Sequence, residues 1–293
     1  MTPLQALVLG IVEGVTEYLP VSSTGHLILV SRALGLAQSS GQRESIDTFN
    51  IVIQGAAIAA VAGLYRREVL AMVRAVLAAC LRLPKRHTHG RALMLARNLA
   101  LSFIPAAIAG LLLGDWIEAR FFRAAPVLMA LALGGIAMVA MAPWVKRKAQ
   151  NATETGPDGS TLSAWAALAV GCLQCVALVP GTSRSMMTIV GALIVGLSPR
   201  EAARYSFLLA LPTLGAACGY KSLGFFKDGL MVDQLGGWIP LAIGFVAAFA
   251  SAALGIAWLI NFLGRGGFAL FGWWRIALAT ALGSAIMSGW MTL

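Results

Sequence analysis

The chain has 293 residues, of which 59% are hydrophobic and 12% are charged, and its mean hydropathy is +0.81. This composition excludes an ordinary soluble domain and indicates a polytopic membrane protein. Its 22 basic and 12 acidic residues give a net charge of +10. In a soluble protein that excess would suggest nucleic-acid binding. In a membrane protein we expect it in cytoplasmic loops beside anionic lipid headgroups, with no nucleic-acid partner.

A polar segment interrupts the first apolar block of the chain. Glu13 and Glu17 are four residues apart, so both carboxylates project from one face of a helix. Pro20 then ends the helix. Three hydroxyls and an imidazole follow: Ser22, Ser23, Thr24 and His26. Ionisable groups at membrane depth cost about 2.5–3.5 kcal/mol each, which favours a functional site over a solvated, capped helix end.

Residues 1–145 form the first expected membrane repeat. Each side of the broken block is too short to span, which predicts a re-entrant helical hairpin. Arginines at 67, 74 and 82 share one face of a helix that we expect on the membrane surface. The expected order is a hairpin at 3–36, a span at 49–65, the surface helix at 69–83, and spans at 98–114 and 124–144.

A polar cytoplasmic linker is expected at 146–161, before a second repeat at 162–293. The second repeat begins with another broken block, and Leu7–Val15 resembles Leu168–Val176. Its expected elements are a re-entrant hairpin at 162–196 and spans at 203–220, 238–262 and 267–291. Three spans per half predict an all-α inverted repeat whose hairpins enter from opposite faces and meet near the midplane.

Basic residues in the loops predict the orientation. Most of the lysines and arginines outside hydrophobic segments lie in the loops expected on one side, at 66–97, 144–161, 197–204 and 265. Positive-inside bias therefore favours a cytoplasmic side there, with both termini and the site opening near 36–48 in the periplasm.

The second break, Pro180 to Ser185, contains Arg184, the one basic residue in a break of this kind. Its planar guanidinium can bind a phosphate in bidentate fashion, with help from neighbouring hydroxyls and backbone N–H groups. Those hydroxyls belong to Thr182, Ser183 and Ser185. The alternative is an internal Arg–Glu ion pair that joins the two halves.

A phosphate pocket with two carboxylates leaves several chemistries open. Glu13 and Glu17 can hold a divalent cation, Mg²⁺ or Ca²⁺, or one of them can act as a base. His26 can transfer protons near neutral pH or merely hydrogen-bond a helix end. Ser23 or Thr24 can be the nucleophile. The Cys172–Cys175 pair lacks the context of a metal or redox site.

Four segments carry a resemblance to the bacterial undecaprenyl-diphosphate phosphatase family, which is associated with bacitracin resistance. They are E-G-V-T-E-Y-L-P-V-S-S-T-G-H from Glu13, P-G-T-S-R-S-M-M-T from Pro180, F-N-I-V-I-Q from Phe49 and Y-S-F-L-L-A-L-P from Tyr205. The resemblance implies an inner-membrane hydrolase that converts a C55 polyprenyl diphosphate to the monophosphate, which recycles the carrier for peptidoglycan synthesis.

The same resemblance implies the site residues. Glu13, Glu17, Ser23 and His26 are the expected catalytic residues, and Arg184 is the expected phosphate-binding arginine. The remaining diphosphate-binding candidates are Ser22, Thr24, Thr182, Ser183, Ser185 and Gln54. Met186 departs from the glycine usual after S-R-S. Another membrane phosphatase superfamily uses two histidines, but this chain has no histidine after His89.

Two rival functions share some of these features. A polyprenyl-phosphate transporter or flippase can also use inverted repeats and broken helices, but it needs no nucleophile. A structural scaffold leaves the buried charges unexplained. We favour Ser23 over water as nucleophile, and a second copy of the chain is a candidate partner.

Overall fold

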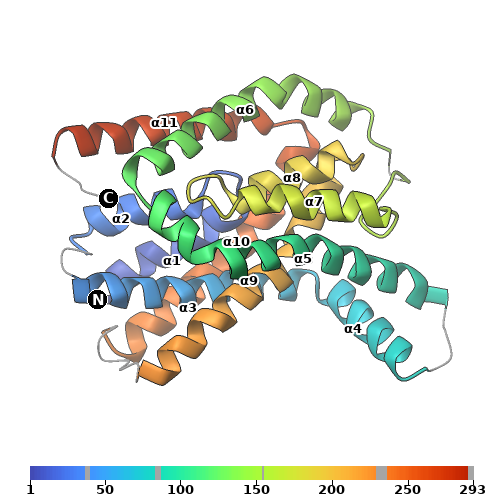
Figure 1. Ribbon diagram of the computed structural model, residues 1–293, viewed down its shortest axis with the longest axis horizontal. Coiled ribbons are helices and arrows are strands. Elements are labelled where there is room, and N and C mark those ends of the chain that lie inside the picture. The colour runs from blue at the N-terminus through green and yellow to red at the C-terminus, as the bar shows by residue number, and fades with distance from the viewer. Residues whose placement is uncertain (37–39, 83–86, 154, 229–235, 290–293) are drawn as a thin grey trace.

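The computed structural model describes residues 1–36, 40–82, 87–153, 155–228 and 236–289, which form eleven α-helices and confirm the all-α fold. Figure 1 shows the helices in several layers, with α6 and α11 along one edge. The helices are α1 Pro3–Tyr18, α2 Ser23–Ala33, α3 Ser40–Leu64, α4 Arg66–Cys80, α5 His87–Phe121, α6 Ala124–Gln150, α7 Ala164–Val176, α8 Arg184–Ile194, α9 Pro199–Asp228, α10 Trp238–Gly264 and α11 Phe268–Met287.

Five helices are long and apolar enough to cross a membrane, which makes the chain a multi-pass membrane protein. Their outer faces carry large apolar side chains; Leu112 and Leu254, for example, are 77% and 74% exposed. Such faces suit lipid rather than water. The five segments are Ser45–Leu64, Gly90–Phe121, Ala124–Gln150, Trp238–Gly264 and Phe268–Met287. Residues 290 and 291 of the expected span at 267–291 lie outside the described residues.

The sixth expected span, 203–220, lies within α9, which is not one of these five. Its residues Phe207 to Ala210 are fully or almost fully buried. Because neighbouring helices cover this part of α9, it does not need an apolar surface all round. The helix therefore forms part of the protein core, against α3, α8 and α10.

Both broken blocks fold as pairs of short helices, α1 with α2 and α7 with α8. These helices have 16, 11, 13 and 11 residues, whereas about 20 are needed to span a bilayer. A reciprocal capping box, in which Thr2 and Gln5 bond each other's backbone N–H, starts α1. The second hairpin begins at Ser163, whose hydroxyl accepts from Ala166 N–H.

The hairpins pack on helices of the opposite half of the chain. The first helix, α1, lies along α10, and α7 lies along α5; α6 also pairs with α11, and α3 with α9. Glycines allow the close approach of α1 and α10: a Cβ at Gly10 or Gly14 would overlap Gly244 or Ser251. The two halves of the chain are thus interlaced rather than separate.

The expected surface helix at 69–83 corresponds to α4, Arg66–Cys80, and residue 83 lies outside the described residues. One of its faces carries exposed apolar residues, including Leu70, Val73 and Leu77. Near its start, Glu68 pairs with Arg204 of α9 at 2.9 Å. This contact fixes α4 against the core while its apolar face stays uncovered.

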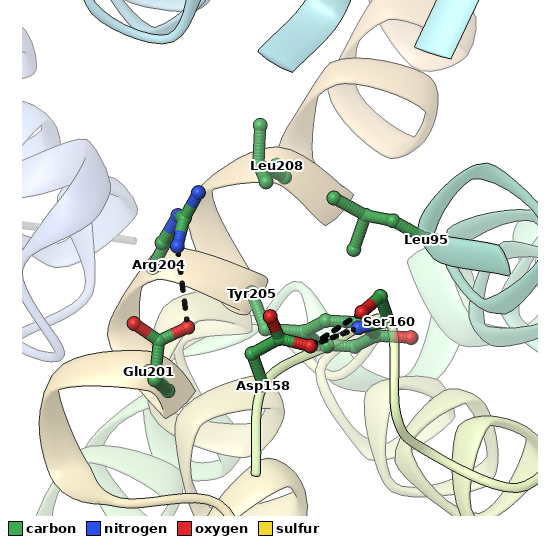
Figure 2. A pocket seen from close by; sticks show the side chains of 8 residues that line it. Leu95, Asp158, Ser160, Glu201, Arg204, Tyr205 and Leu208 are labelled. Carbon is green, nitrogen blue, oxygen red and sulfur yellow. Dashed lines mark hydrogen bonds and ion pairs between the residues drawn. The ribbon is translucent and has the colours of Figure 1, made fainter. Parts of the chain in front are cut away.

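The segment expected as a linker begins inside α6, which continues to Gln150, and Glu154 lies outside the described residues. Its later part is anchored, since the fully buried Asn98 donates to the carbonyls of Gly159 and Leu162, both at 2.9 Å. Figure 2 shows the Asp158–Ser160 turn against Tyr205 of α9. This end of the molecule lies opposite the N-terminus in Figure 1.

Candidate active site

The first turn places two carboxylates inside the protein. Glu13 and Glu17 follow one another along α1 and are 1% and 7% exposed. The helix ends at Tyr18, and the chain turns so that Ser22 becomes the residue before α2, with a φ of 69°. A positive φ in a serine is strained, which is common where a chain is held for function.

Ser23, the first residue of α2, lies beside Glu17. Its Oγ donates a hydrogen bond of 2.8 Å to Glu17 Oε2. A hydroxyl held by a carboxylate is the arrangement in which the carboxylate can remove the proton from a nucleophile. The structure thus brings together one carboxylate and one hydroxyl of the polar segment.

The second turn repeats the form of the first. Ser183 precedes α8 with a φ of 75°, and its Oγ accepts from Met186 N–H at 3.3 Å. The Ser183 and Ser185 hydroxyl oxygens are 3.0 Å apart, and Ser185 Oγ donates to the Leu19 carbonyl at 2.9 Å. The two turns therefore touch directly.

Arg184 crosses from the second hairpin to the first. Its Nη2 pairs with Glu17 Oε1 at 3.1 Å, and its Nη1 donates to the Ser206 carbonyl at 3.2 Å. The guanidinium also lies over the Tyr18 ring, 5.5 Å from the centroid. Its buried Nε has no hydrogen-bond partner among the described residues, which leaves a donor for a ligand.

Among the described residues, Glu13 lacks a hydrogen-bond donor, just as Arg184 Nε lacks an acceptor. Its Oε2 is buried and accepts no hydrogen bond from the described residues. A buried carboxylate without a partner is costly, so a cation, a proton or a ligand must meet it when the site works. No cluster of three or more acidic, histidine or cysteine ligands occurs in the described part of the chain. Two carboxylates still suit Mg²⁺, which commonly binds one or two of them together with substrate phosphates and water.

His26 contacts a different part of the protein. Its Nδ1 lies 2.8 Å from the Ser22 carbonyl, and its Nε2 accepts from Trp274 Nε1 at 2.7 Å. These partners put the ring proton on Nδ1 and occupy both nitrogens. The imidazole therefore supports the turn in this geometry, while its part in proton transfer stays a prediction.

The remaining candidates are dispersed. Thr24 is exposed. Ser22 is buried, and its carbonyl oxygen accepts a hydrogen bond from His26 Nδ1. Thr182 contributes its carbonyl, which accepts from Arg275 at 2.9 Å. Gln54 of α3 accepts from Cys218 Sγ of α9 at 3.1 Å, and none of its described contacts reaches Glu17 or Arg184.

Met186, where the resembled family usually has glycine, lies in the first turn of α8 and is 5% exposed. Its side chain packs into the main hydrophobic core, and its N–H bonds Ser183 Oγ. The larger residue is thus accommodated in the core. It leaves the contacts of Arg184 and Ser185 intact.

Sequence reasoning missed Arg275. This arginine of α11 is fully buried, and carbonyls of both turns accept its hydrogen bonds. The available signal was an arginine within a strongly apolar helix, which usually marks a functional place.

Together these features define a class: a helical multi-pass membrane protein with a buried, charged site where two broken hairpins meet. The model of one family, described as bacitracin resistance protein BacA, matches residues 6–281, and the chain belongs to this family.

Curated relatives agree over almost the whole chain. A protein of Cereibacter sphaeroides named undecaprenyl-diphosphatase is 39% identical over 292 residues, covering 99% of this chain and 98% of the relative. One of Sorangium cellulosum with the same name is 42% identical over 274 residues, covering 93% and 83%. Undecaprenyl-diphosphatase 1 of Chromobacterium violaceum is 42% identical over 273 residues, covering 93% and 92%.

Proposed function

We propose that this chain hydrolyses undecaprenyl diphosphate to undecaprenyl phosphate and inorganic phosphate, which recycles the lipid carrier for peptidoglycan synthesis. The observation that carries the proposal is the chain of contacts from Ser23 through Glu17 to Arg184. It joins a hydroxyl, a base and a phosphate-binding cation across two hairpins. The names of the relatives supply the substrate, and the membrane fold suits its long polyprenyl chain.

In the proposed reaction, Arg184 binds the diphosphate through its free Nε and holds the terminal phosphate beside Ser23. Glu17 removes the Ser23 proton as Oγ attacks the terminal phosphorus. The bond from phosphorus to the bridging oxygen breaks and undecaprenyl phosphate leaves, with a phosphoserine remaining. Water then hydrolyses the phosphoserine, releases phosphate and restores the hydroxyl.

A divalent cation, Mg²⁺ or Ca²⁺, would be held by Glu13 and Glu17 and would neutralise charge on the diphosphate. The unpartnered Oε2 of Glu13 supports this choice. The residues of the chain would still bind and orient the substrate and accept the proton. In the alternative mechanism, Ser23 only hydrogen-bonds the phosphate and a water molecule activated by a glutamate attacks.

We further propose that the protein lies in the bacterial inner membrane, with its termini and the site opening on the periplasmic side. Clustered basic residues at 66–97 and 146–148 support this orientation. An inverted relation between the halves is supported by the reciprocal packing of α1 on α10 and α7 on α5. The expected opening near 36–48 includes residues 37–39, which lie outside the described residues. Membrane lipids and a second copy of the chain are the further partners we propose.

Phosphate release by the purified protein tests the function. The assay would compare undecaprenyl diphosphate with inorganic diphosphate, with and without chelator and added Mg²⁺ or Ca²⁺. We expect lipid-dependent release that falls roughly 100-fold or more in Ser23→Ala and Glu17→Gln. A transporter would instead bind the lipid without releasing phosphate.

A further inference from the structure

Arg275 is the largest fully buried side chain in the described part of the molecule. It leaves α11 and lies between this helix and α6, and no acidic residue is among its described contacts. All five of its N–H donors point to backbone carbonyl oxygens. The bonds run from Nε to Leu131 (3.4 Å), from Nη1 to Thr182 (2.9 Å) and Pro20 (3.5 Å), and from Nη2 to Gly181 (2.8 Å) and Ala130 (2.9 Å).

Three of these carbonyls belong to the two turns of the site. Pro20 comes two residues before Ser22, and Gly181 and Thr182 come directly before Ser183. Because a peptide unit is planar, fixing a carbonyl also fixes the N–H of the next residue on the opposite side. The Thr182 contact therefore orients the peptide that leads into Ser183.

Both turns need such support. Ser22 and Ser183 have φ values of 69° and 75°, a region that costs non-glycine residues about 1–3 kcal/mol. Two site residues already link the hairpins, since Ser185 bonds the Leu19 carbonyl and Arg184 pairs with Glu17. Arg275 adds a connection between the backbones of the two turns, because one guanidinium nitrogen bonds the carbonyls of Pro20 and Thr182.

We propose that Arg275 is a positioning residue that holds the two turns at a fixed separation, and so keeps Ser23 and Glu17 in register with Arg184. It does not touch the proposed reacting atoms; it acts through the backbone. The effect of Arg275 on turnover rests on the proposed hydrolysis. Its hydrogen bonds to the two turns do not depend on that function.

The α6 partners suggest a purely structural alternative, in which Arg275 only fastens α11 to α6. Two of the five carbonyls, those of Ala130 and Leu131, fit that role. The glycine at 134 shows how little room surrounds the guanidinium, since a Cβ there would overlap it. Gly134→Ala should therefore displace Arg275 without changing its charge.

The test compares Arg275→Lys and Gly134→Ala with Leu282→Ala. Leu282 is also fully buried on α11, seven residues after Arg275, in an apolar cluster with Val127, Leu131 and Leu278. Lysine keeps the charge but has three donors on a point-like head, so it cannot reach five carbonyls. Hydrogen exchange of peptides covering 19–23 and 181–185 would be measured with turnover, KM and thermal stability.

We expect Arg275→Lys and Gly134→Ala to speed exchange in both turns and to lower kcat by roughly 10- to 100-fold, more than they raise KM. Leu282→Ala should lower the melting temperature yet leave exchange in the turns and kcat within about twofold, because it only opens a core cavity. The role is refuted if Arg275→Lys leaves exchange unchanged, or if Leu282→Ala loses as much activity for the same loss of stability. If the wild type did not hydrolyse the lipid, the proposed function would be refuted. The comparison of exchange rates would still test whether Arg275 holds the two turns.

Discussion

Arg184 and Glu17 are 167 residues apart in the chain, and their side chains meet at 3.1 Å with only 11% and 5% exposure. A buried ion pair is weak evidence for stability, because desolvation offsets much of the attraction. The importance of this pair lies in the groups beside it that stay available to a substrate. Glu17 also accepts a hydrogen bond from the Ser23 hydroxyl, and Arg184 Nε has no acceptor among the described residues, so it can donate to an anion.

Removing one member of this pair should harm both fold and function. Breaking a buried pair costs about 3–5 kcal/mol, since a charge is left unpartnered. We therefore expect Arg184→Gln to lower the melting temperature, and the double variant Arg184→Gln/Glu17→Gln to regain much of it while staying inactive. Thermal unfolding and phosphate release of Arg184→Gln, Glu17→Gln and the double variant would check this. Equal stability of single and double variants would contradict a coupled pair.

Ser23 and Glu17 should behave as one unit in kinetics. Each single substitution, Ser23→Ala or Glu17→Gln, is expected to lower kcat by roughly 100-fold or more, and the double variant should lose little beyond the worse single one. The cycle is measured at saturating substrate. Losses that multiply in the double variant would show that the two residues act independently.

His26 should matter less than Ser23. Both of its nitrogens are bonded, to the Ser22 carbonyl and to Trp274. We expect His26→Asn and Trp274→Phe to lower kcat by about tenfold or less, and to leave the shape of the pH–rate profile unchanged. If His26→Asn alone lost one limb of the pH–rate profile, His26 would be assigned the proton-transfer role that the sequence suggested.

The Asp158 turn predicts a pH effect on stability. Burial would raise the pKa of the Asp158 carboxyl, but hydrogen bonds from Ser160 and the Arg91 contact together hold it below its ordinary value. A lowered pKa in the folded state stabilises the protein above the unfolded value of about 3.9, and this is lost as pH falls through the folded pKa. Asp158→Asn should thus lower the melting temperature at pH 7 only slightly, because Arg91 is 78% exposed and solvent screens its attraction to Asp158. The difference should vanish well below pH 4, and one that persists there would contradict the assignment.

Orientation can be tested by labelling single cysteines in whole cells. We expect an impermeant reagent to reach a cysteine at residue 2, and to reach residue 147 only after the membrane is opened. The basic residues around 147 predict that side as cytoplasmic. Labelling at 147 in intact cells would reverse the proposed topology.

Local patterns predicted much of this structure. Apolar blocks broken by proline and polar residues located both helical hairpins, and the four-residue spacing placed Glu13 and Glu17 on one face of α1. The lengths of α6 and α9 were underestimated, because the expected spans end where the apolar pattern ends. The helix α6 continues through the exposed Lys146 and Arg147 to Gln150, since lysine, arginine and glutamine are good helix formers.

The contacts between distant segments were harder to predict. Spacing can suggest that Arg184 faces the glutamates, but it cannot show that His26 turns to Trp274 or that Arg275 reaches five carbonyls. Those contacts depend on how α11 packs on α6 and on the backbone direction at Ser22 and Ser183. A hydroxyl or imidazole in a motif therefore indicates a site without fixing which atom performs which step.

The proposed mechanism requires that Ser23 attacks the terminal phosphorus. Its most direct test is rapid acid quenching of the enzyme with undecaprenyl diphosphate labelled in the terminal phosphate, followed by mapping of protein-bound label. We expect label on Ser23 that appears before phosphate is released and is absent from Ser23→Ala. No protein-bound label at any time, together with substantial turnover by Ser23→Ala, would contradict it and make water the nucleophile.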